Sequence, residues 1–160
     1  MSEALNRCSL CGAVLPPSKA CHEMRDELFG YTLTLGRGEF IHQHAVDAYA
    51  AQHRSSDTKP INQAAALIGL FLFVERGYNG RQVQLAHMKL GNKMKTWPLF
   101  EPPGERAALT VMDVLQAPAG AERDESVKHW ARAVWEMWEV RHAEVEQWLR
   151  KEYGSFQTGV

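Results

Sequence analysis

Apolar residues recur at helical spacing over the last part of the chain. No glycine or proline interrupts residues 124–153, and apolar side chains fall three, four or seven positions apart on one stripe. The stripe consists of Val127, Ala131, Val134, Trp138, Val145 and Leu149. Because residues at these spacings share one face of a helix, the pattern predicts a single amphipathic helix over residues 124–153.

Helical patterns also occur earlier in the chain. Helices are expected over residues 19–31, 39–54, 61–76 and 80–95. Ser18 is the expected N-cap of the first helix. The third follows Pro60, ends before Gly77 and is apolar on nearly every side, so it should be central and buried. On the fourth, His87 is expected at the surface.

Two other segments are less regular. Residues 109–116 fit either a short helix or a strand, because a proline soon follows them. Residues 97–104 are apolar and rich in proline, which makes them unsuitable for a helix but too hydrophobic to stand free in solvent. We expect this connector to lie packed across the surface of the other elements.

The predicted elements define a fold class. No pair of alternating segments joined by a tight turn indicates a β-hairpin, and 160 residues are typical of one domain. The sequence predicts an all-α, single-domain helical bundle over residues 1–160. Within it we expect a small N-terminal CxxC metal-binding knuckle at residues 1–17, helices within 18–153 and a tail at 154–160.

Composition narrows the function classes. Lys and Arg number 18 and Asp and Glu 19, a net charge of −1, so no positive field is available to hold a phosphate backbone. The longest apolar run, residues 64–74, is shorter than the roughly 20 residues that cross a bilayer. The N-terminus has no apolar signal core. We therefore expect a cytoplasmic protein that binds neither nucleic acid nor membrane.

The three cysteines have the spacing of a metal site. Cys8-x-x-Cys11-Gly12 lets two thiolates hold one ion from a tight turn, where the glycine relieves the backbone. Cys21 is expected at the start of the first helix, whose positive end favours a thiolate. Three thiolates and a histidine most often hold Zn²⁺, although they also suit Fe²⁺. The alternative is three unrelated cysteines, whose CxxC spacing is accidental or a redox pair, but the βαβ setting that is usual for a redox pair is missing.

Several histidines are candidates for the fourth ligand. They are His22, His42, His44 and His53. His22 adjoins Cys21, and neighbouring side chains on a helix diverge by roughly 100°. We choose the first histidine of the next predicted helix. The predicted metal ligands are Cys8, Cys11, Cys21 and His42.

Three histidines stand on apolar stripes of predicted helices. His42 and His53 share a helical face with Val46 and Tyr49, so this face is expected to point inward. His142 stands within the stripe of the last predicted helix. Because an unsatisfied buried polar group costs about 1 to 3 kcal/mol, each ring needs a partner. Either these are core histidines bonded to nearby groups, or His53 and His142 converge in one polar site as ligands or as acid and base.

Tryptophans are concentrated in the last predicted helix. Four of the five are Trp130, Trp135, Trp138 and Trp148. Trp138 is expected in the core and the others at an interface. A stacking platform for nucleobases would need unmatched basic charge, whereas the Lys and Arg here are balanced by glutamates. We expect a homodimer through this helix, and no small-molecule ligand is specified.

Residues along almost the whole chain resemble one family. The resemblance rests on Cys8-x-x-Cys11-Gly12-Ala13 with Cys21, on His42 with Val46-Asp47-Ala48-Tyr49 and Gln52-His53, and on later segments at 97–103, 109–114 and 130–145. These resemble a bacterial family of uncharacterised proteins catalogued as domain of unknown function 5946. The resemblance implies one domain of bacterial origin. It also implies two groups, Cys8, Cys11, Cys21 and His42, and His53 with His142.

The chain departs from the family pattern at two positions. His44 follows His42 by two and offers a rival ligand, and Arg54 stands where proline is expected. The favoured function is a small zinc-binding protein whose metal is structural and closed by four protein ligands. The alternative is a metal-dependent hydrolase or transferase in which His53 or His142 moves a proton. A third is an interaction module that uses the tryptophan-rich helix.

Overall fold

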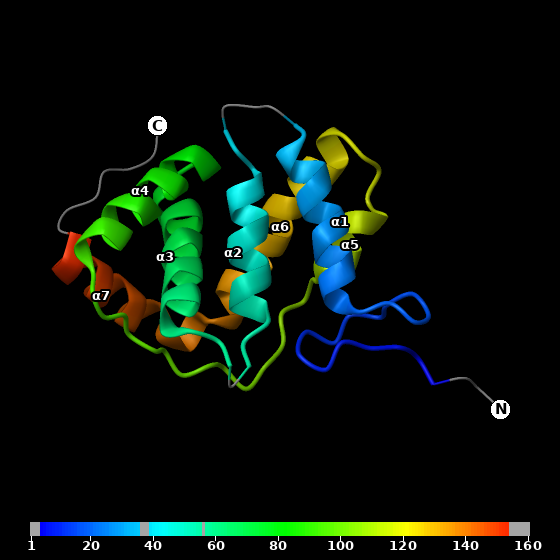
Figure 1. Cartoon of the computed structure of the whole chain (residues 1–160), viewed down its shortest axis with the longest axis horizontal. Helices are drawn as coiled ribbons and strands as arrows, with labels where there is room; N and C mark the ends of the chain where they lie inside the picture. Colours follow the sequence, from blue (N-terminus) through cyan, green and yellow to red (C-terminus); the bar gives the residue numbers. More distant parts are fainter. Residues whose placement is uncertain (1–3, 36–38, 56, 154–160) are drawn as a thin grey trace.

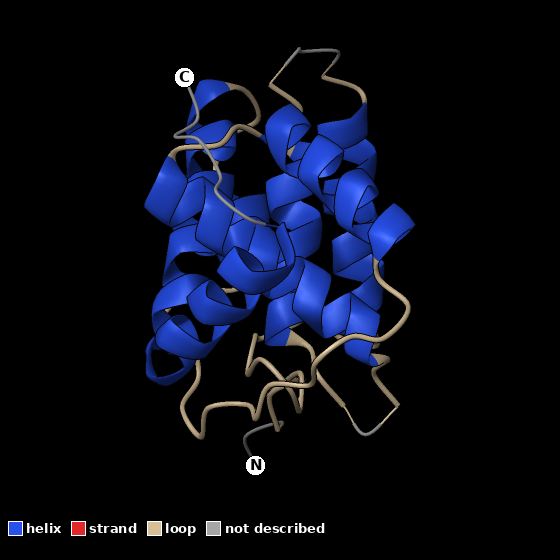
Figure 2. Ribbon diagram, turned by 90° about the vertical axis from the view of Figure 1, so that its left-hand side faces the viewer, coloured by secondary structure: helices blue, strands red, loops and turns tan. Residues whose placement is uncertain are grey.

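The protein is all-α, as the sequence predicts. The computed structural model describes residues 4–35, 39–55 and 57–153, so the predicted tail at 154–160 lies outside the described residues. The helices are α1 (Cys21–Leu33), α2 (His42–Gln52), α3 (Pro60–Arg76), α4 (Gly80–Lys93), α5 (Val111–Gln116), α6 (Ala121–Met137), the 3₁₀ turn η1 (Glu139–Arg141) and α7 (His142–Tyr153). Figure 2 shows helices and loops but no strand in the described part of the chain, where the one β element is an isolated antiparallel bridge between Arg7 and Val14.

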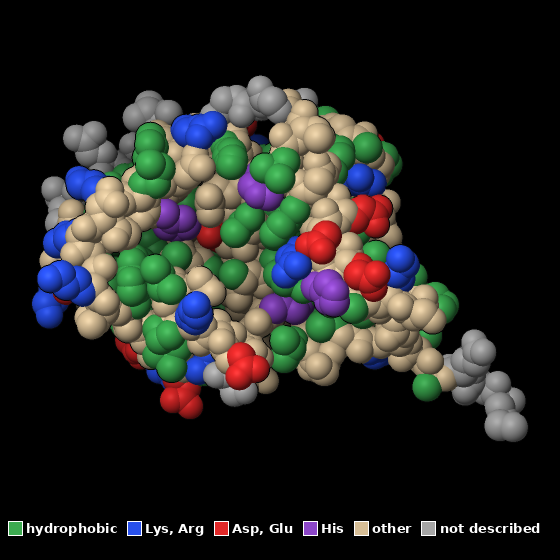
Figure 3. Space-filling model, viewed as in Figure 1, with side chains coloured by type: hydrophobic (Ala, Val, Ile, Leu, Met, Phe, Trp, Pro, Cys, Tyr) green, Lys and Arg blue, Asp and Glu red, His purple; other side chains and the backbone are tan. Residues whose placement is uncertain are grey.

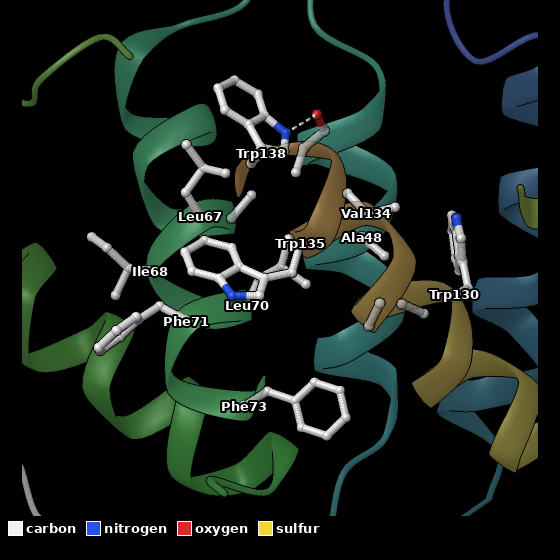
Figure 4. Close-up of a cluster of buried hydrophobic side chains, with 14 of the residues drawn as sticks. Ala48, Leu67, Ile68, Leu70, Phe71, Phe73, Trp130, Val134, Trp135 and Trp138 are labelled. Atoms are coloured by element: carbon white, nitrogen blue, oxygen red, sulfur yellow. Dashed lines mark hydrogen bonds between the residues drawn. The ribbon is translucent and has the colours of Figure 1, made fainter. Parts of the chain in front are cut away.

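Helix α3 lies among the other helices because nearly all of its surface is apolar. It contacts α2, α4, α6 and α7, and its residues 66–73 are all buried. As predicted, Pro60 occupies the first turn, and Gly77 ends the helix in the left-handed conformation that glycine adopts at no steric cost. The Phe71 ring of α3 meets Trp135 edge-on with 6.0 Å between centroids, and Figure 4 shows Leu67, Leu70 and Phe71 in one buried cluster with Trp135 and Trp138.

The prediction of one helix over 124–153 is wrong. The chain breaks at Trp138, so α6 is followed by η1 and then by α7 in a different direction. The Trp138 indole is buried, and its Nε1–H donates to the Ala51 carbonyl at 3.1 Å. Helix α6 packs on both α2 and α3, whereas α7 packs on α3. The break therefore lets both halves of one apolar stripe reach the core.

Several helix boundaries also differ from the prediction. Ser18 is not the N-cap of α1, because its φ of +63° places it in a turn and the helix begins at Cys21. The Ala20 N–H at this end donates to the Glu23 carboxylate at 2.7 Å. Segment 109–116 resolves into α5, whose Thr110 side chain accepts from the Met112 N–H. These local caps decide where the helices start.

Three of the four C-terminal tryptophans lie in the core. Trp130, Trp135 and Trp138 are at most 1 % exposed. The Trp130 indole N–H donates to the Gln52 side chain, and that of Trp135 to Glu75. The expectation that Trp130 and Trp135 belong to an interface is therefore wrong. Dimerisation through this region stays a prediction. Of the four tryptophans, Trp148 is the one that is half-buried and could contribute to such an interface.

The proline-rich connector packs across the helices as expected. Phe100 at its centre is buried, and its backbone N–H and carbonyl both bond to the buried Gln63 side chain at 2.8 Å. This pairing satisfies two backbone groups that have no partner in a helix or a sheet.

None of the helices in the described part of the chain is both long and apolar enough to span a bilayer. On the face in Figure 3, basic and acidic side chains are interspersed.

A buried carboxyl lies at the contact of α2 and α3. Asp47 is 3 % exposed, and its Oδ1 accepts from the Gln43 amide at 3.1 Å, whereas Oδ2 has no hydrogen-bond partner among the described residues. Burial raises the pKa of Asp47 well above its ordinary value. The folded protein therefore binds a proton that the unfolded chain releases above a pKa of about 4.

We expect Asp47→Asn to stabilise the protein increasingly as the pH rises. Since the folded pKa is raised, the carboxyl favours folding only at low pH, and this contribution is lost upward from about pH 4 toward the folded pKa. Over that window the variant should gain about 1.4 kcal/mol per pH unit relative to wild type. Urea unfolding between pH 5 and 8 measures this difference. Asp57→Asn in an exposed loop is the control, and a pH-independent difference at Asp47 would contradict the assignment.

Candidate metal site

The N-terminal segment folds into a tight knuckle around the CxxC motif. The Cys8 N–H donates to the Ala13 carbonyl at 3.0 Å, and the Gly12 N–H returns to the Cys8 carbonyl at 2.9 Å. Gly12 has a φ of +81°, a left-handed conformation that side chains other than glycine rarely adopt. The Ala13 N–H points at Cys11 Sγ, 3.4 Å away. The turn thus presents Cys8 and Cys11 on the same side.

Contacts with two distant segments hold the knuckle in place. The Asn6 side-chain amide donates to the carbonyls of Pro16 and Lys19, both at 2.8 Å, which fixes the path from the knuckle into α1. Arg106, which follows the connector, donates to the Ser9 carbonyl at 3.1 Å. A Cβ on Gly12 would approach the Arg106 guanidinium to 2.8 Å. Glycine here therefore serves both the turn and this close packing.

Helices α1 and α2 add one ligand group each. Cys21 is the first residue of α1, and His53 is the C-cap of α2. Because these helices run antiparallel through a short connection, the start of α1 lies beside the end of α2 (Figure 1). The ligand atoms of four residues all lie within 4.8 Å of one another. They belong to Cys8, Cys11, Cys21 and His53.

Two of the separations between ligand atoms match the edges of a tetrahedral zinc site. A Zn–S bond of about 2.3 Å and a Zn–N bond of about 2.0 Å put neighbouring sulfurs about 3.8 Å apart and a sulfur and nitrogen about 3.5 Å apart. Cys11 Sγ lies 3.9 Å from Cys21 Sγ, and Cys21 Sγ lies 3.3 Å from His53 Nε2. The four residues are therefore already spaced to hold one metal ion.

The His53 ring is oriented for ligation through Nε2. Its Nδ1 lies 2.8 Å from the Tyr49 carbonyl, to which it donates, so Nε2 carries the free lone pair. The ring stacks on Tyr49 with 3.7 Å between centroids. A backbone partner on the other ring nitrogen is usual for metal-bound histidines, because it fixes both tautomer and orientation.

His42 does not join the cysteines, which corrects the predicted ligand set. It begins α2, eleven residues before His53, which is about 16 Å along a helix. Its Nδ1 shares a hydrogen bond of 2.8 Å with the Thr32 hydroxyl, its ring meets Phe29 edge-on, and burial lowers its pKa. His22, adjacent to Cys21, is exposed. The group of Cys8, Cys11 and Cys21 implied by the resemblance is thus completed by His53.

The second predicted group, His53 with His142, is not brought together by these contacts. His142 stacks on Trp135 with 3.8 Å between centroids, and its Nε2 donates to the Trp135 carbonyl at 2.7 Å. His142 is therefore a half-buried histidine whose ring is satisfied by a backbone carbonyl, in line with the first of the two alternatives. His87, expected at the surface, is half-buried and bonds to the Ala65 carbonyl at 2.7 Å. The face of α2 that carries His53 lies against α1 rather than at the centre.

The thiols interact strongly with one another. The hydrogen bond between the Cys11 and Cys21 thiols lowers the pKa of Cys21. The same bond, together with the smaller effect of burial, raises the pKa of Cys11 to about 12. Burial, followed by the charge of Cys21, raises the pKa of Tyr49. Arg25 lies over the Tyr49 ring at 5.3 Å and is the nearby positive charge. A divalent cation at this place would stabilise the thiolate form of all three cysteines.

His53 is among the four candidates for the fourth ligand that the sequence offers, but the prediction chose His42 instead. A usable signal was present, because Cys21 starts one predicted helix and His53 ends the next. Two consecutive helices joined by a short loop run antiparallel, so the end of the second lies beside the start of the first. Choosing the first histidine of the second helix ignored this reversal of direction.

Comparison with known proteins identifies one family. The model of a family of unknown function, DUF5946, matches residues 6–139. No curated protein and no solved structure matches the chain.

Proposed function

We propose that this chain, which belongs to DUF5946, is a small zinc-binding protein whose metal has a structural role. Zn²⁺ would be held by Cys8, Cys11, Cys21 and His53. The metal would tie the knuckle to the start of α1 and the end of α2. Such a site contributes directly to folding free energy, because its ligands are scattered in the unfolded chain.

The observation that supports this proposal is the convergence of four ligand atoms within 4.8 Å of one another, with two of their separations close to those of a tetrahedral zinc site. Four protein ligands close the coordination sphere of zinc, which is characteristic of structural sites. Three thiolates with one imidazole favour zinc over the harder cations. The cysteines are free thiols here, and we propose a reducing, cytoplasmic location in which they stay available as ligands.

The alternative, a metal-dependent enzyme, is less well supported. A catalytic metal needs an open coordination position beside a substrate cleft. The cavity next to Cys11 measures about 120 Å³, below the roughly 300 to 1,000 Å³ typical of ligand pockets. His142, proposed as its acid or base, donates to a backbone carbonyl instead. The structural role is therefore our first choice.

Elemental analysis of two histidine variants tests the ligand set. Wild-type protein purified without chelators should contain about one zinc per chain. We expect His53→Ala to lose most of it, whereas His42→Ala, on the same helix, should retain it. Circular dichroism of each variant checks that α2 remains folded. Metal retained in His53→Ala but lost in His42→Ala would contradict the site, and iron in place of zinc would contradict the metal.

A further inference from the structure

A second cavity lies at the other end of α2 from the cysteines. Its volume is about 340 Å³, within the range of small-molecule sites. The residues on which the argument rests are Ile41, His44, Phe73, Tyr78, Lys128 and Arg132. They come from α2, the end of α3 and the middle of α6, which pack on one another. This cavity shares no lining residue with the metal group.

His44 supplies a buried polar group to this cavity. His44 is only 3 % exposed, and its ring stacks on Phe73 with 3.9 Å between centroids. Among the described residues neither ring nitrogen has a hydrogen-bond partner, unlike the nitrogens that anchor His42, His53 and His142. Burial, then the charges of Lys128 and Arg132, lower the pKa of His44 to about 4. At neutral pH the ring therefore offers one N–H donor.

Two cations stand beside this ring. The Arg132 guanidinium lies 5.2 Å from the centroid of Phe73, the ring on which His44 stacks. Lys128 also lines the cavity, and its ammonium forms an ion pair with the Glu125 carboxylate at 3.3 Å. Glu39 also lines the cavity and opposes them with one negative charge. The lining residues thus carry one more positive than negative charge, which favours a monovalent anion over a dianion.

The wall formed by residues 39–41 is held in position. The Arg81 N–H donates to the Glu39 carbonyl at 3.1 Å, and the Arg81 guanidinium lies over Phe40 at 4.7 Å. A Cβ on Gly80 would lie 1.8 Å from the Phe40 carbonyl oxygen, so the start of α4 closely abuts this segment. On the α4 side the cavity is therefore bounded by packed backbone. A ligand would find this wall already formed.

We propose that this cavity binds a small organic carboxylate carrying one negative charge. The carboxylate would lie between the Arg132 guanidinium and the Lys128 ammonium and accept the His44 N–H. Its apolar body would lie along Ile41, Val74 and Tyr78, which line the same cavity. Charge-assisted bonds from Arg suit the planar carboxylate, and a bound acceptor would satisfy the buried imidazole. The inference is independent of the zinc proposal.

Titration with benzoate tests the site on the intact, metal-loaded protein. We expect saturable shifts of the backbone amide resonances of His44, Phe73 and Arg132, with none from benzamide, its neutral analogue. Arg132→Met should weaken benzoate binding about tenfold, because the charge-assisted bond to the carboxylate is lost. Lys151→Met, an exposed charge on α7, is the matched control and should leave binding unchanged.

Three outcomes would overturn the proposal. The first is the absence of saturable shifts at these amides at millimolar benzoate. The second is equal binding of benzamide, which would reduce the cavity to an apolar depression. The third is inorganic phosphate binding more tightly than benzoate, which would exclude a preference for monovalent carboxylates. Loss of benzoate binding in Arg132→Met and in His44→Phe, with Lys151→Met unaffected, would support it.

Discussion

Cys21→Ser is expected to abolish zinc binding and to lower the melting temperature by about 10 °C. Cys21 is the member of the group that begins α1, so its loss would release the knuckle from both α1 and α2. Serine fits the space of the thiol but is a poor zinc ligand. Losing a structural metal should cost at least about 3 kcal/mol, and each kcal/mol shifts the melting temperature by about 2–4 °C in a chain of this size.

Chelation separates loss of the metal from damage to packing. EDTA should lower the melting temperature of wild type toward that of Cys21→Ser and leave the variant unchanged. Hydrogen exchange gives a local measure, because the amides of Cys8, Gly12 and Leu15 make the hydrogen bonds of the knuckle. They should lose protection on chelation while amides of α3 keep it. A lowered melting temperature in Cys21→Ser, together with a wild-type melting temperature that EDTA does not change, would exclude a structural metal.

Gly69→Ala is expected to destabilise the protein by about 3 kcal/mol. A Cβ at this position would lie 1.9 Å from Asp47 Oδ2 and 3.1 Å from His87 Nε2, inside the contact of α2, α3 and α4. Such overpacking of a core costs typically 1–3 kcal/mol or more, and here the displaced group is a buried carboxyl. Urea unfolding at pH 7 measures the loss.

Gly91→Ala is the matched control for Gly69→Ala. Gly91 is also in a helix, but a Cβ there meets nothing within 4 Å. Alanine should therefore stabilise α4 by about 0.5–1 kcal/mol through helix propensity alone. In an Asp47→Ala background the methyl group finds room, so the added cost of Gly69→Ala should fall below about 1 kcal/mol. Equal effects of alanine at both glycines would contradict the close packing at Gly69.

Helical periodicity predicted most elements but not the turn at Trp138. The stripe that includes Val145 and Leu149 continues the spacing of α6, so the residues to be buried were correctly identified. Periodicity reports which side chains leave water, not which neighbour covers them. The neighbours change at Trp138, from α2 and α3 for α6 to α3 for α7. Only the three-dimensional arrangement contains that change.

The histidines show the same division. Their presence at helical positions was evident from the sequence, but their partners were not. His53 belongs with the cysteines, His142 with the Trp135 carbonyl, and His44 with Phe73. Each partner is distant in sequence or depends on the direction in which a side chain leaves its helix. Buried Asp47 was likewise not recognised as an isolated carboxyl.

By itself the sequence determined the all-α fold, the central place of α3 and the grouping of Cys8 and Cys11. These follow from short-range causes: the period of apolar residues, proline and glycine at helix ends, and the two-residue spacing that a tight turn requires. The tertiary structure alone decided that His53 completes the metal group and that a polar cavity forms around His44. Both depend on the relative direction and packing of helices, which arise when distant apolar faces are buried together.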